Sequence, residues 1–208
     1  MTTTVGILVF DNMELLDFAG PYEVFTTASR VHHRSHPSEL DLFRVITIGR
    51  AGSAVRARAG LGIRPDYDFE NHPQIDILVI PGGVVTDELT KPQVIGWIAE
   101  ASRGSRLTSS VCTGAFLLAQ AGLLNGKSAT THWEDIADLK KMFPSVNVRE
   151  DKRWVDEGSI VTSAGISAGI DMSLHLVERM AGRELAARTA HQMEFYWFEK
   201  AEPERNVA

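Results

Sequence analysis

The sequence contains a single cysteine, Cys112, among its 208 residues. One cysteine cannot form an intrachain disulfide, and it cannot supply a thiolate zinc cluster by itself. No apolar run approaches the roughly 18 residues of a membrane-spanning helix, and the first residues lack the basic start and apolar block of a signal peptide. Basic residues are outnumbered, with 21 Lys and Arg against 27 Asp and Glu. Because nucleic acids require a basic surface, we expect no nucleic-acid partner. The missing apolar run and signal peptide lead us to expect a cytoplasmic protein without a membrane partner.

What the sequence does contain is a regular alternation of strand and helix patterns. Short, β-branched apolar runs predict buried strands at 4–10, 42–48, 76–80 and 107–111. Helical spacing predicts helices at 93–103, 113–121, 134–143, 169–181 and 184–193. Such alternation is typical of an α/β fold, a mainly parallel sheet covered by helices on both faces. We expect one domain over residues 1–198 and a polar C-terminal tail at 199–208.

Other segments carry weaker patterns. Gly20-Pro21 interrupts the first apolar helical segment, so we expect a bend at 17–20 and a helix that begins at Pro21. The polar segment 32–39 reads as an exposed loop, and 52–63 as a short hairpin or edge strands. Further short strands are expected at 128–131, 146–149, 153–155 and 160–163, with a hairpin turn at 156–158.

The segment Ser-Val-Cys-Thr-Gly at 110–114 is the most informative motif. It joins a buried strand directly to a helix and has the small-x-nucleophile-x-small form of a nucleophile elbow. Small flanking residues are needed because the sharp turn brings backbone segments together, and the turn exposes the central side chain. A helix N-terminus favours negative charge, so we expect the thiolate of Cys112 to be stabilised there, with free N–H groups at Thr113 and Gly114.

Two other loops should lie at the same edge of the sheet as Cys112. Ligands of parallel α/β sheets bind beyond the carboxyl ends of the strands. The predicted strand order along the chain places two loops there, at 10–17 and 81–83. The N–H groups of Gly82 and Gly83 are candidate donors to a ligand. Asp17 stands inside an apolar run, which predicts a buried acid with a raised pKa that exchanges protons with Cys112 or its substrate. The rival carboxylate, Glu23, is expected to be exposed.

His132 ends a short predicted strand and is a candidate base or binding residue beside Cys112, or else a structural histidine. Gly165 and Ile166 open a late helix and would place small groups and free N–H groups beside the cleft. The remaining histidines fall in polar loops or late helices, listed here as His32, His33, His36, His72, His175 and His191. No pair has metal-binding spacing on a convincing helix, so we predict no metal.

Taken together, five ordered motifs resemble the ThiJ/PfpI superfamily. They are Leu-Asp-Phe-Ala-Gly-Pro-Tyr-Glu-Val-Phe at 16–25, Ile-Pro-Gly-Gly at 80–83, Ser-Val-Cys-Thr-Gly at 110–114, Ala-Thr-Thr-His-Trp at 129–133 and Ala-Gly-Ile-Ser-Ala-Gly-Ile-Asp at 164–171. The resemblance spans most of the chain. It implies a flavodoxin-like three-layer sandwich, a homodimer, and an acid at Asp17 placed against the thiolate of Cys112.

Within that superfamily the chain is most similar to the isocyanide hydratases. That group pairs an aspartate at the position of Asp17 with Cys-Thr at Cys112-Thr113 and Gly-Ile at Gly165-Ile166. The resemblance implies a cofactor-independent cysteine enzyme that hydrates a small-molecule isocyanide to an N-formamide, with Thr113 positioning water or the acid. Phe195 stands where that group has a tyrosine. The protease-like branch carries histidine where this chain has Thr113, so a peptidase would lack its base.

Two other functions remain open at the level of sequence. One is glyoxalase or deglycase chemistry at Cys112, in which His132 serves as an added base. The other is a non-catalytic redox or ligand sensor, because an exposed thiol of low pKa is the first to be oxidised. Dependence of turnover on Cys112 would separate either enzyme from the sensor, and dependence on His132 would separate the two enzymes.

Overall fold

The computed structural model describes residues 2–198, and their centre is a seven-stranded sheet. Its strand order is β10-β11-β7-β6-β1-β2-β5, and every neighbouring pair is parallel except β10 with β11. In chain order the strands are β1 (Thr3–Leu8), β2 (Phe43–Gly49), β5 (Tyr67–Asp68), β6 (Ile77–Ile80), β7 (Leu107–Val111), β10 (Trp154–Asp156) and β11 (Ile160–Ser163). The predicted parallel sheet is therefore present.

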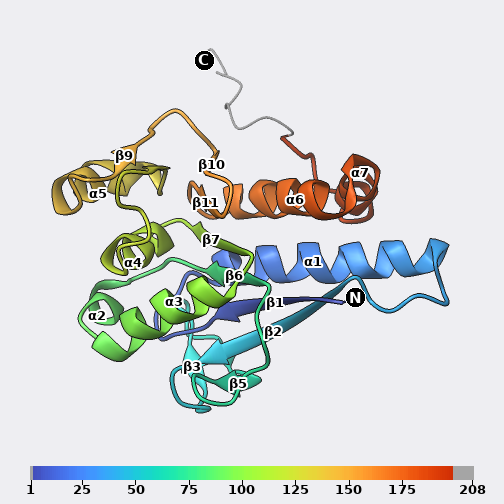
Figure 1. Cartoon of the computed structure of the whole chain (residues 1–208), viewed down its shortest axis with the longest axis horizontal. Helices are drawn as coiled ribbons and strands as arrows, with labels where there is room; N and C mark the ends of the chain where they lie inside the picture. Colours follow the sequence, from blue (N-terminus) through green and yellow to red (C-terminus); the bar gives the residue numbers. More distant parts are fainter. Residues whose placement is uncertain (1, 199–208) are drawn as a thin grey trace.

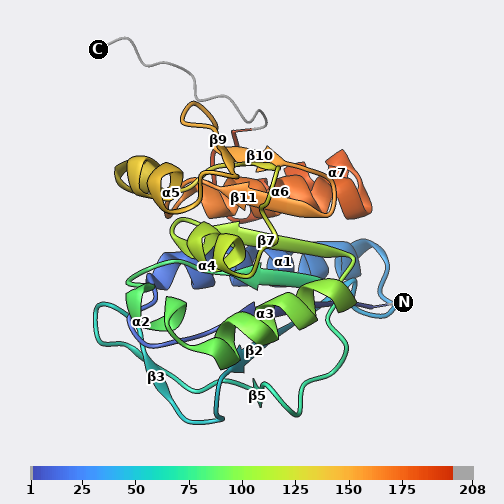
Figure 2. The same ribbon diagram turned by 60° about the vertical axis from the view of Figure 1, so that its left-hand side comes forward.

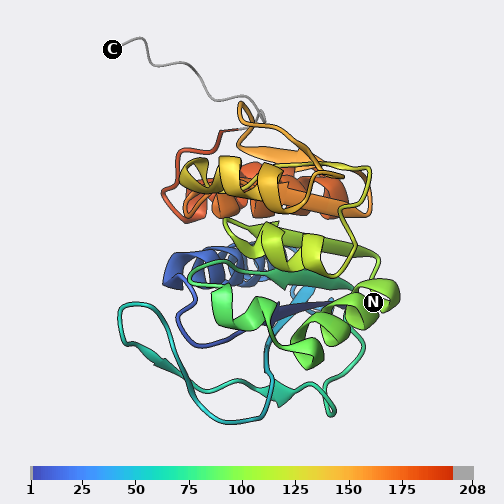
Figure 3. The same cartoon turned by 90° about the vertical axis from the view of Figure 1, so that its left-hand side faces the viewer.

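Helices cover both faces of this sheet, which gives three layers (Figure 1; Figure 2). One face carries α1 (Leu15–Ser35), α6 (Ala168–Ala181) and α7 (Arg183–Gln192), which contact one another. Figure 3 shows the C-terminal helices, orange to red, beside the blue first helix. The other layer contains α2 (Thr86–Leu89), α3 (Pro92–Gly104), α4 (Gly114–Gln120) and α5 (Ile136–Met142), the last preceded by a 3₁₀ turn, η1 (Trp133–Asp135).

Alternating side chains on the strands build the two cores. On β6, Ile77 and Val79 pack toward the layer of α1, α6 and α7, whereas Leu78 and Ile80 pack toward α3 and α4. All four are fully buried, as a strand covered on both faces requires. Because β1, β6 and β7 run parallel, their carboxyl ends meet at one edge of the sheet. The loops after these three strands therefore converge there.

The first helix differs from the sequence prediction. It begins at Leu15, runs through Pro21 without a break and ends at Ser35, so no bend separates Asp17 from the helix. Pro21 lies near the start of a long helix that is held by packing on α6 and α7. Gly20 makes the contact with α6 close, since a Cβ there would lie 2.9 Å from Ile170 Cγ1. Tertiary packing has overridden the local helix-breaking signal.

The polar segment 32–39 is consequently part helix and part loop. Residues 32–35 complete α1, and the ring of His32 stacks on that of His36 at 4.3 Å. The predicted short hairpin is confirmed as β3 (Val55–Arg56) paired antiparallel with β4 (Gly62–Ile63). The hairpin of β10 and β11 is confirmed as well. β8 (Ser128–Ala129) and β9 (Asn147–Val148) form a separate parallel pair, and the predicted tail at 199–208 lies outside the described residues.

Candidate active site

Cys112 sits on a strained turn between β7 and α4. Its φ is 57°, a left-handed conformation that residues with a Cβ seldom adopt and that costs on the order of 1–2 kcal/mol. The turn is held by several hydrogen bonds. The Cys112 N–H donates to the carbonyl oxygens of Ser163 and Ala164, and the hydroxyl of Thr131 donates to the Cys112 carbonyl at 2.9 Å. This geometry confirms that the segment 110–114 forms a nucleophile elbow.

The small residue after the elbow is required by a backbone contact. A Cβ at Gly114 would lie 2.2 Å from the carbonyl oxygen of Ile80 and 2.9 Å from that of Pro81. Both atoms belong to backbone that is fixed by the sheet and the loop after β6. Gly114 therefore allows α4 to begin against the neighbouring strand, as the motif predicts.

Replacing Gly114 with alanine is expected to lower the free energy of unfolding by about 3 kcal/mol, because the methyl group displaces buried backbone. Urea unfolding followed by circular dichroism measures the change. Gly96→Ala is the matched control, since Gly96 is a helical glycine of α3 with no atom within 4 Å of the added Cβ. That control should gain about 0.5–1 kcal/mol. Equal effects of the two substitutions would contradict the backbone clash.

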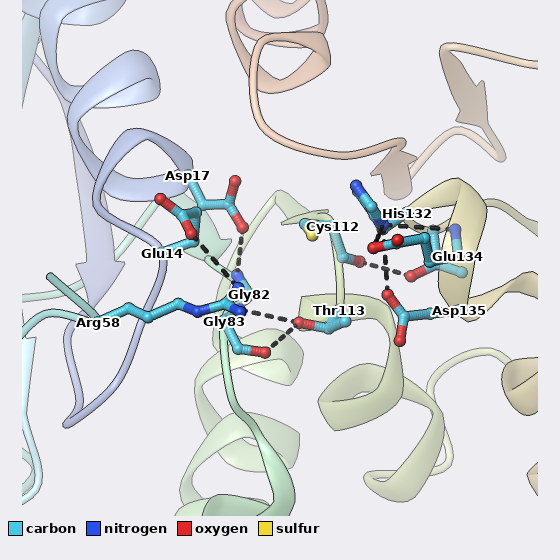
Figure 4. A network of polar contacts seen from close by, with 11 residues as sticks. Glu14, Asp17, Arg58, Gly82, Gly83, Cys112, Thr113, His132, Glu134 and Asp135 are labelled. Atoms are coloured by element: carbon cyan, nitrogen blue, oxygen red, sulfur yellow. Dashed lines mark hydrogen bonds and ion pairs between the residues drawn. The ribbon is translucent and has the colours of Figure 1, made fainter.

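Asp17 lies in the first turn of α1 and is fully buried. Its Oδ2 accepts a hydrogen bond from the Gly82 N–H at 3.0 Å, and its Oδ1 is buried with no partner of standard geometry among residues 2–198. Burial raises the pKa of Asp17 to about 7, and the negative charge of Glu14 adds to this increase. Hydrogen bonds from Gly82 and Cys112 oppose it. The predicted acid of raised pKa is therefore present, and Figure 4 shows it facing Cys112.

The thiol of Cys112 differs from its prediction. Burial and the negative charge of Asp17 raise the pKa of Cys112 to about 12, although hydrogen bonding from Thr113 lowers it. The expected stabilisation of a thiolate by the start of α4 is thus outweighed, because the side chain is only 7% exposed and faces a carboxyl group. At neutral pH the resting pair is a protonated thiol beside an acid that ionises near pH 7. Asp17 is therefore placed to act as the base for Cys112.

The loop after β6 connects the acid to the helix of the nucleophile. The Gly82 N–H donates to Asp17, and the Gly83 N–H donates to the hydroxyl of Thr113 at 2.8 Å. The Thr113 hydroxyl donates in turn to the Gly83 carbonyl at 2.8 Å (Figure 4). Both glycine N–H groups are thus used inside the protein. The backbone N–H and the side chain of Thr113 both form hydrogen bonds with the Cys112 sulfur, and these lower the pKa of the thiol. Substrate binding by Gly82 and Gly83 stays a prediction.

His132 stands on the other side of Cys112 from Asp17 (Figure 4). Its Nδ1 accepts a hydrogen bond from the Glu134 N–H at 3.4 Å and lies 3.5 Å from Asp135 Oδ2. Its ring packs so closely against Gly165 that a Cβ there would lie 2.0 Å from Cδ2. Gly165 thus makes room for the imidazole beside the elbow. The next residue, Ile166, has a φ of 53° and is 38% exposed.

A cleft of about 450 Å³ opens above the elbow. Of the residues predicted from sequence, Cys112, Thr113, Gly83, His132 and Ile166 line it. The other three predicted residues do not line the cleft. Asp17 and Gly82 are buried behind Thr113, and Gly165 is covered by the imidazole of His132. Within the described residues no three His, Cys, Asp or Glu side chains gather as a metal site, and no helix there is long and apolar enough to cross a membrane.

Several residues of the cleft were not predicted from sequence. Phe116 of α4 and Met142 of α5 contribute apolar surface, and Arg58 reaches in from the β3–β4 hairpin. Three carboxylates of η1 and α5 line it as well, namely Glu134, Asp135 and Asp138. A further carboxylate, Glu14, lies 3.7 Å from Arg58. None of these residues stood out in the sequence. The spacing of Glu14 one helical turn before Asp17 is visible only once α1 is known to begin at Leu15.

Comparison with known proteins now gives the family. The profile of the DJ-1/PfpI family matches residues 3–179, which include Asp17, Cys112 and His132. The chain belongs to the DJ-1/PfpI family. The resemblance seen in the sequence is thereby confirmed, and with it the flavodoxin-like α/β sandwich. A solved structure of a THiJ/PfpI family protein from Pseudomonas syringae superimposes with a TM-score of 0.82 at 24% identity, covering 100% of this chain and 80% of that one.

Relatives within the DJ-1/PfpI family have different names. Isonitrile hydratase of Pseudomonas putida is 32% identical over 196 residues, which are 94% of this chain and 79% of that protein. The HTH-type transcriptional regulator GbdR of Pseudomonas aeruginosa is 36% identical over 185 residues, which are 88% of this chain. The chain spans about half the length of that regulator, 48%. The family therefore includes both an enzyme and transcriptional regulators, so membership alone does not determine which reaction, if any, the protein catalyses.

The segment around Phe195 lies away from this cleft. Phe195 and Trp197 are partly buried and pack against the layer of α1, α6 and α7, while Tyr196 between them is 82% exposed. Phe195 is thus a packing residue in this structure. The rival carboxylate, Glu23, has a side chain that is 54% exposed, as the sequence predicts.

Proposed function

We propose that this protein is a cofactor-independent isocyanide hydratase, a cysteine-dependent hydro-lyase that converts an isocyanide to an N-formamide. The observation that supports the reaction type is the pairing of Cys112, on its elbow, with the buried carboxyl group of Asp17. The observation that supports the substrate is the 32% identity to an isonitrile hydratase across nearly the whole chain, since isonitrile is another name for isocyanide. The cleft of about 450 Å³ has room for a small alkyl or aryl isocyanide.

The first half of the proposed reaction forms a carbon–sulfur bond. Asp17, ionised near pH 7, takes the thiol proton as Sγ of Cys112 attacks the terminal carbon of R–N≡C. Asp17 then returns that proton to the same carbon, which would otherwise carry the electron pair as a carbanion. The product is a thioimidate, R–N=CH–S–Cys112. Atoms balance, because the thiol hydrogen becomes the hydrogen on carbon and the carboxylate is regenerated.

The second half adds water and releases the enzyme. The Asp17 carboxylate takes a proton from water as the oxygen attacks the thioimidate carbon, and the carboxylic acid so formed gives that proton to the nitrogen, which regenerates the carboxylate. The tetrahedral intermediate, R–NH–CH(OH)–S–Cys112, breaks its carbon–sulfur bond, and the hydroxyl proton returns to sulfur by way of the carboxylate. The products are R–NH–CHO and the free thiol. The Thr113 N–H beside the sulfur is suited to stabilise the charge that forms there in both halves.

Incubation of the purified protein with an uncharged isocyanide such as cyclohexyl isocyanide tests the proposal. We expect formamide by gas chromatography and, in rapidly quenched samples, an intact-protein mass increase equal to one isocyanide. Methylglyoxal in parallel tests the second candidate, which is favoured by the placement of His132 in the same cleft. Turnover of methylglyoxal alone, lost in His132→Gln, would replace the hydratase by glyoxalase-type chemistry. Absence of both turnovers would support the non-catalytic redox or ligand sensor.

The homodimer, the cytoplasmic location, and the absence of nucleic-acid and membrane partners stay predictions from the sequence.

A further inference from the structure

The side chains that line the cleft have an unequal distribution of charge. Glu134 and Asp135 lie on the side of Cys112 away from Glu14 and Arg58 (Figure 4), and Asp138 follows them on α5. The loop after β6 and helix α2 contribute apolar lining, from Val84, Val85 and Leu89. We refer to Glu134, Asp135 and Asp138 together as the acidic wall. It faces a cleft that contains the nucleophile, so its charge acts on whatever approaches Cys112.

The positive charge in the cleft does not neutralise the acidic wall. Arg58 is the one lysine or arginine among the described residues that line the cleft, and it lies 3.7 Å from Glu14. Within residues 2–198 the basic group nearest Glu134 and Asp135 is His132, whose Nδ1 lies 3.6 and 3.5 Å from their carboxylate oxygens and pairs with them as a charge only when the imidazole is protonated. Burial raises the pKa of Asp135, His132 opposes this increase, and the charges of Glu134 and Asp138 raise the pKa further. These carboxylates therefore repel one another and leave a negative potential in the cleft.

We propose that the acidic wall selects substrates by charge, admitting molecules with a cationic or uncharged substituent and excluding anionic ones. A cationic group beside the wall neutralises carboxylates that otherwise repel, whereas an anion gives up water and meets further negative charge. Phe116 and Met142 offer apolar contact to the rest of such a molecule. The proposal deepens the proposed function by naming the substrate class. The selection itself acts on any reagent that reaches Cys112.

Charged thiol reagents measure this selection without any turnover, because Cys112 is the single cysteine. The probes are trimethylammonioethyl and sulfonatoethyl methanethiosulfonate, which differ in charge. Rates of modification are followed by intact mass and divided by the rates for free mercaptoethanol. We expect the cationic reagent to be favoured by about tenfold or more at low salt, with a smaller preference at 0.5 M NaCl.

The acidic wall is tested by the triple variant Glu134→Gln, Asp135→Asn and Asp138→Asn, which should lose most of the preference. Its matched control removes three exposed carboxylates outside the cleft, by Glu23→Gln, Glu39→Gln and Glu150→Gln. Both variants change the net charge equally and keep Asp17, so the difference between them isolates the wall. A wall variant that keeps the wild-type ratio, or a control that loses it equally, would overturn the proposal.

Isocyanides that carry an ammonium or a carboxylate group at the same position extend the test to turnover. If the uncharged isocyanide is not hydrated while the reagent ratio behaves as expected, the hydratase is refuted and the charge selection stands. If the uncharged isocyanide is hydrated while the ratio does not respond to the wall variant, the hydratase stands and the charge selection is refuted.

Discussion

The Cys112→Ala variant is expected to lose formamide formation by roughly 10⁴-fold or more, because the sulfur is the nucleophile of the first half-reaction and carries the thioimidate that water attacks in the second. The intact-mass increase after quenching should disappear at the same time. The fold should survive, since alanine keeps the Cβ of a residue that is already left-handed at φ 57° and loses only one buried atom. Steady-state formamide assays and circular dichroism measure the two effects separately.

Cys112→Ser is the companion variant, because it keeps the size and hydrogen-bonding capacity of the side chain but replaces the thiol by a much weaker acid. It should be as inactive as the alanine variant. Substantial turnover by either variant would exclude covalent catalysis at this position and leave Asp17 acting on water directly.

Replacing Asp17 with asparagine is expected to lower kcat/KM by roughly 10²–10⁴-fold. Asparagine keeps an acceptor for the Gly82 N–H but cannot take the proton from the Cys112 thiol, whose pKa is about 12. Glu23→Gln is the matched control, since it removes an exposed carboxylate from the same helix. An Asp17 variant with the activity of this control would show that the thiol has another base.

The pH profile should report the same group. Because the pKa of Asp17 is about 7, wild-type kcat/KM is expected to rise with pH as the carboxyl group ionises and to level off above that value. The Asp17→Asn variant should lack this step. Its residual rate should instead rise only in the alkaline range, because burial keeps the pKa of the Cys112 thiol raised even without the charge of Asp17. A step near pH 7 that persists in the variant would assign it to a group other than Asp17.

As the pH rises through the pKa of Asp17, the stability of the folded protein should fall while its activity rises. The pKa of Asp17 is about 7 in the folded protein and 3.8 in its unperturbed state, so the native state binds the extra proton between these values. Wild-type stability therefore falls as pH rises through this window, by up to about 4 kcal/mol at pH 8. Asparagine has no charge to bury. The free energy of unfolding of Asp17→Asn should thus exceed that of wild type by about 2–4 kcal/mol at pH 8 and nearly equal it at pH 4. Urea titrations at the two pH values measure both.

The sequence predicts the chemical centre well because that information is local. The segment 110–114 specifies the elbow by its small flanking residues, and Asp17 is conspicuous as a carboxylate within an apolar run. Parallel strands then bring the two loops to one edge of the sheet, although 95 positions separate them. The continuity of α1 through Pro21 could not be predicted in this way, because it depends on packing against α6 and α7.

The sign of the thiol shift is the clearest difference between sequence and structure. A helix start predicts a lowered pKa, but the burial of Cys112 and the nearness of Asp17 are properties of the folded chain. The acidic wall was missed for a similar reason. Glu134, Asp135 and Asp138 read as ordinary polar residues at the start of a helix, and only their common orientation toward the cleft gives them a collective effect.

The hydrogen bonds of Gly82 and Gly83 have a consequence for how this site can change its substrate. A Cβ at position 82 would lie 2.5 Å from Thr113 Oγ1 and 2.9 Å from Asp17 Oδ2, so the absence of a side chain allows Asp17 and Thr113 to approach each other across Gly82. Any other residue there moves both groups at once. The floor of the cleft is therefore a rigid reaction centre that tolerates little variation. New substrates can be accommodated through the walls, where α2, η1 and α5 present side chains that no catalytic contact holds in place.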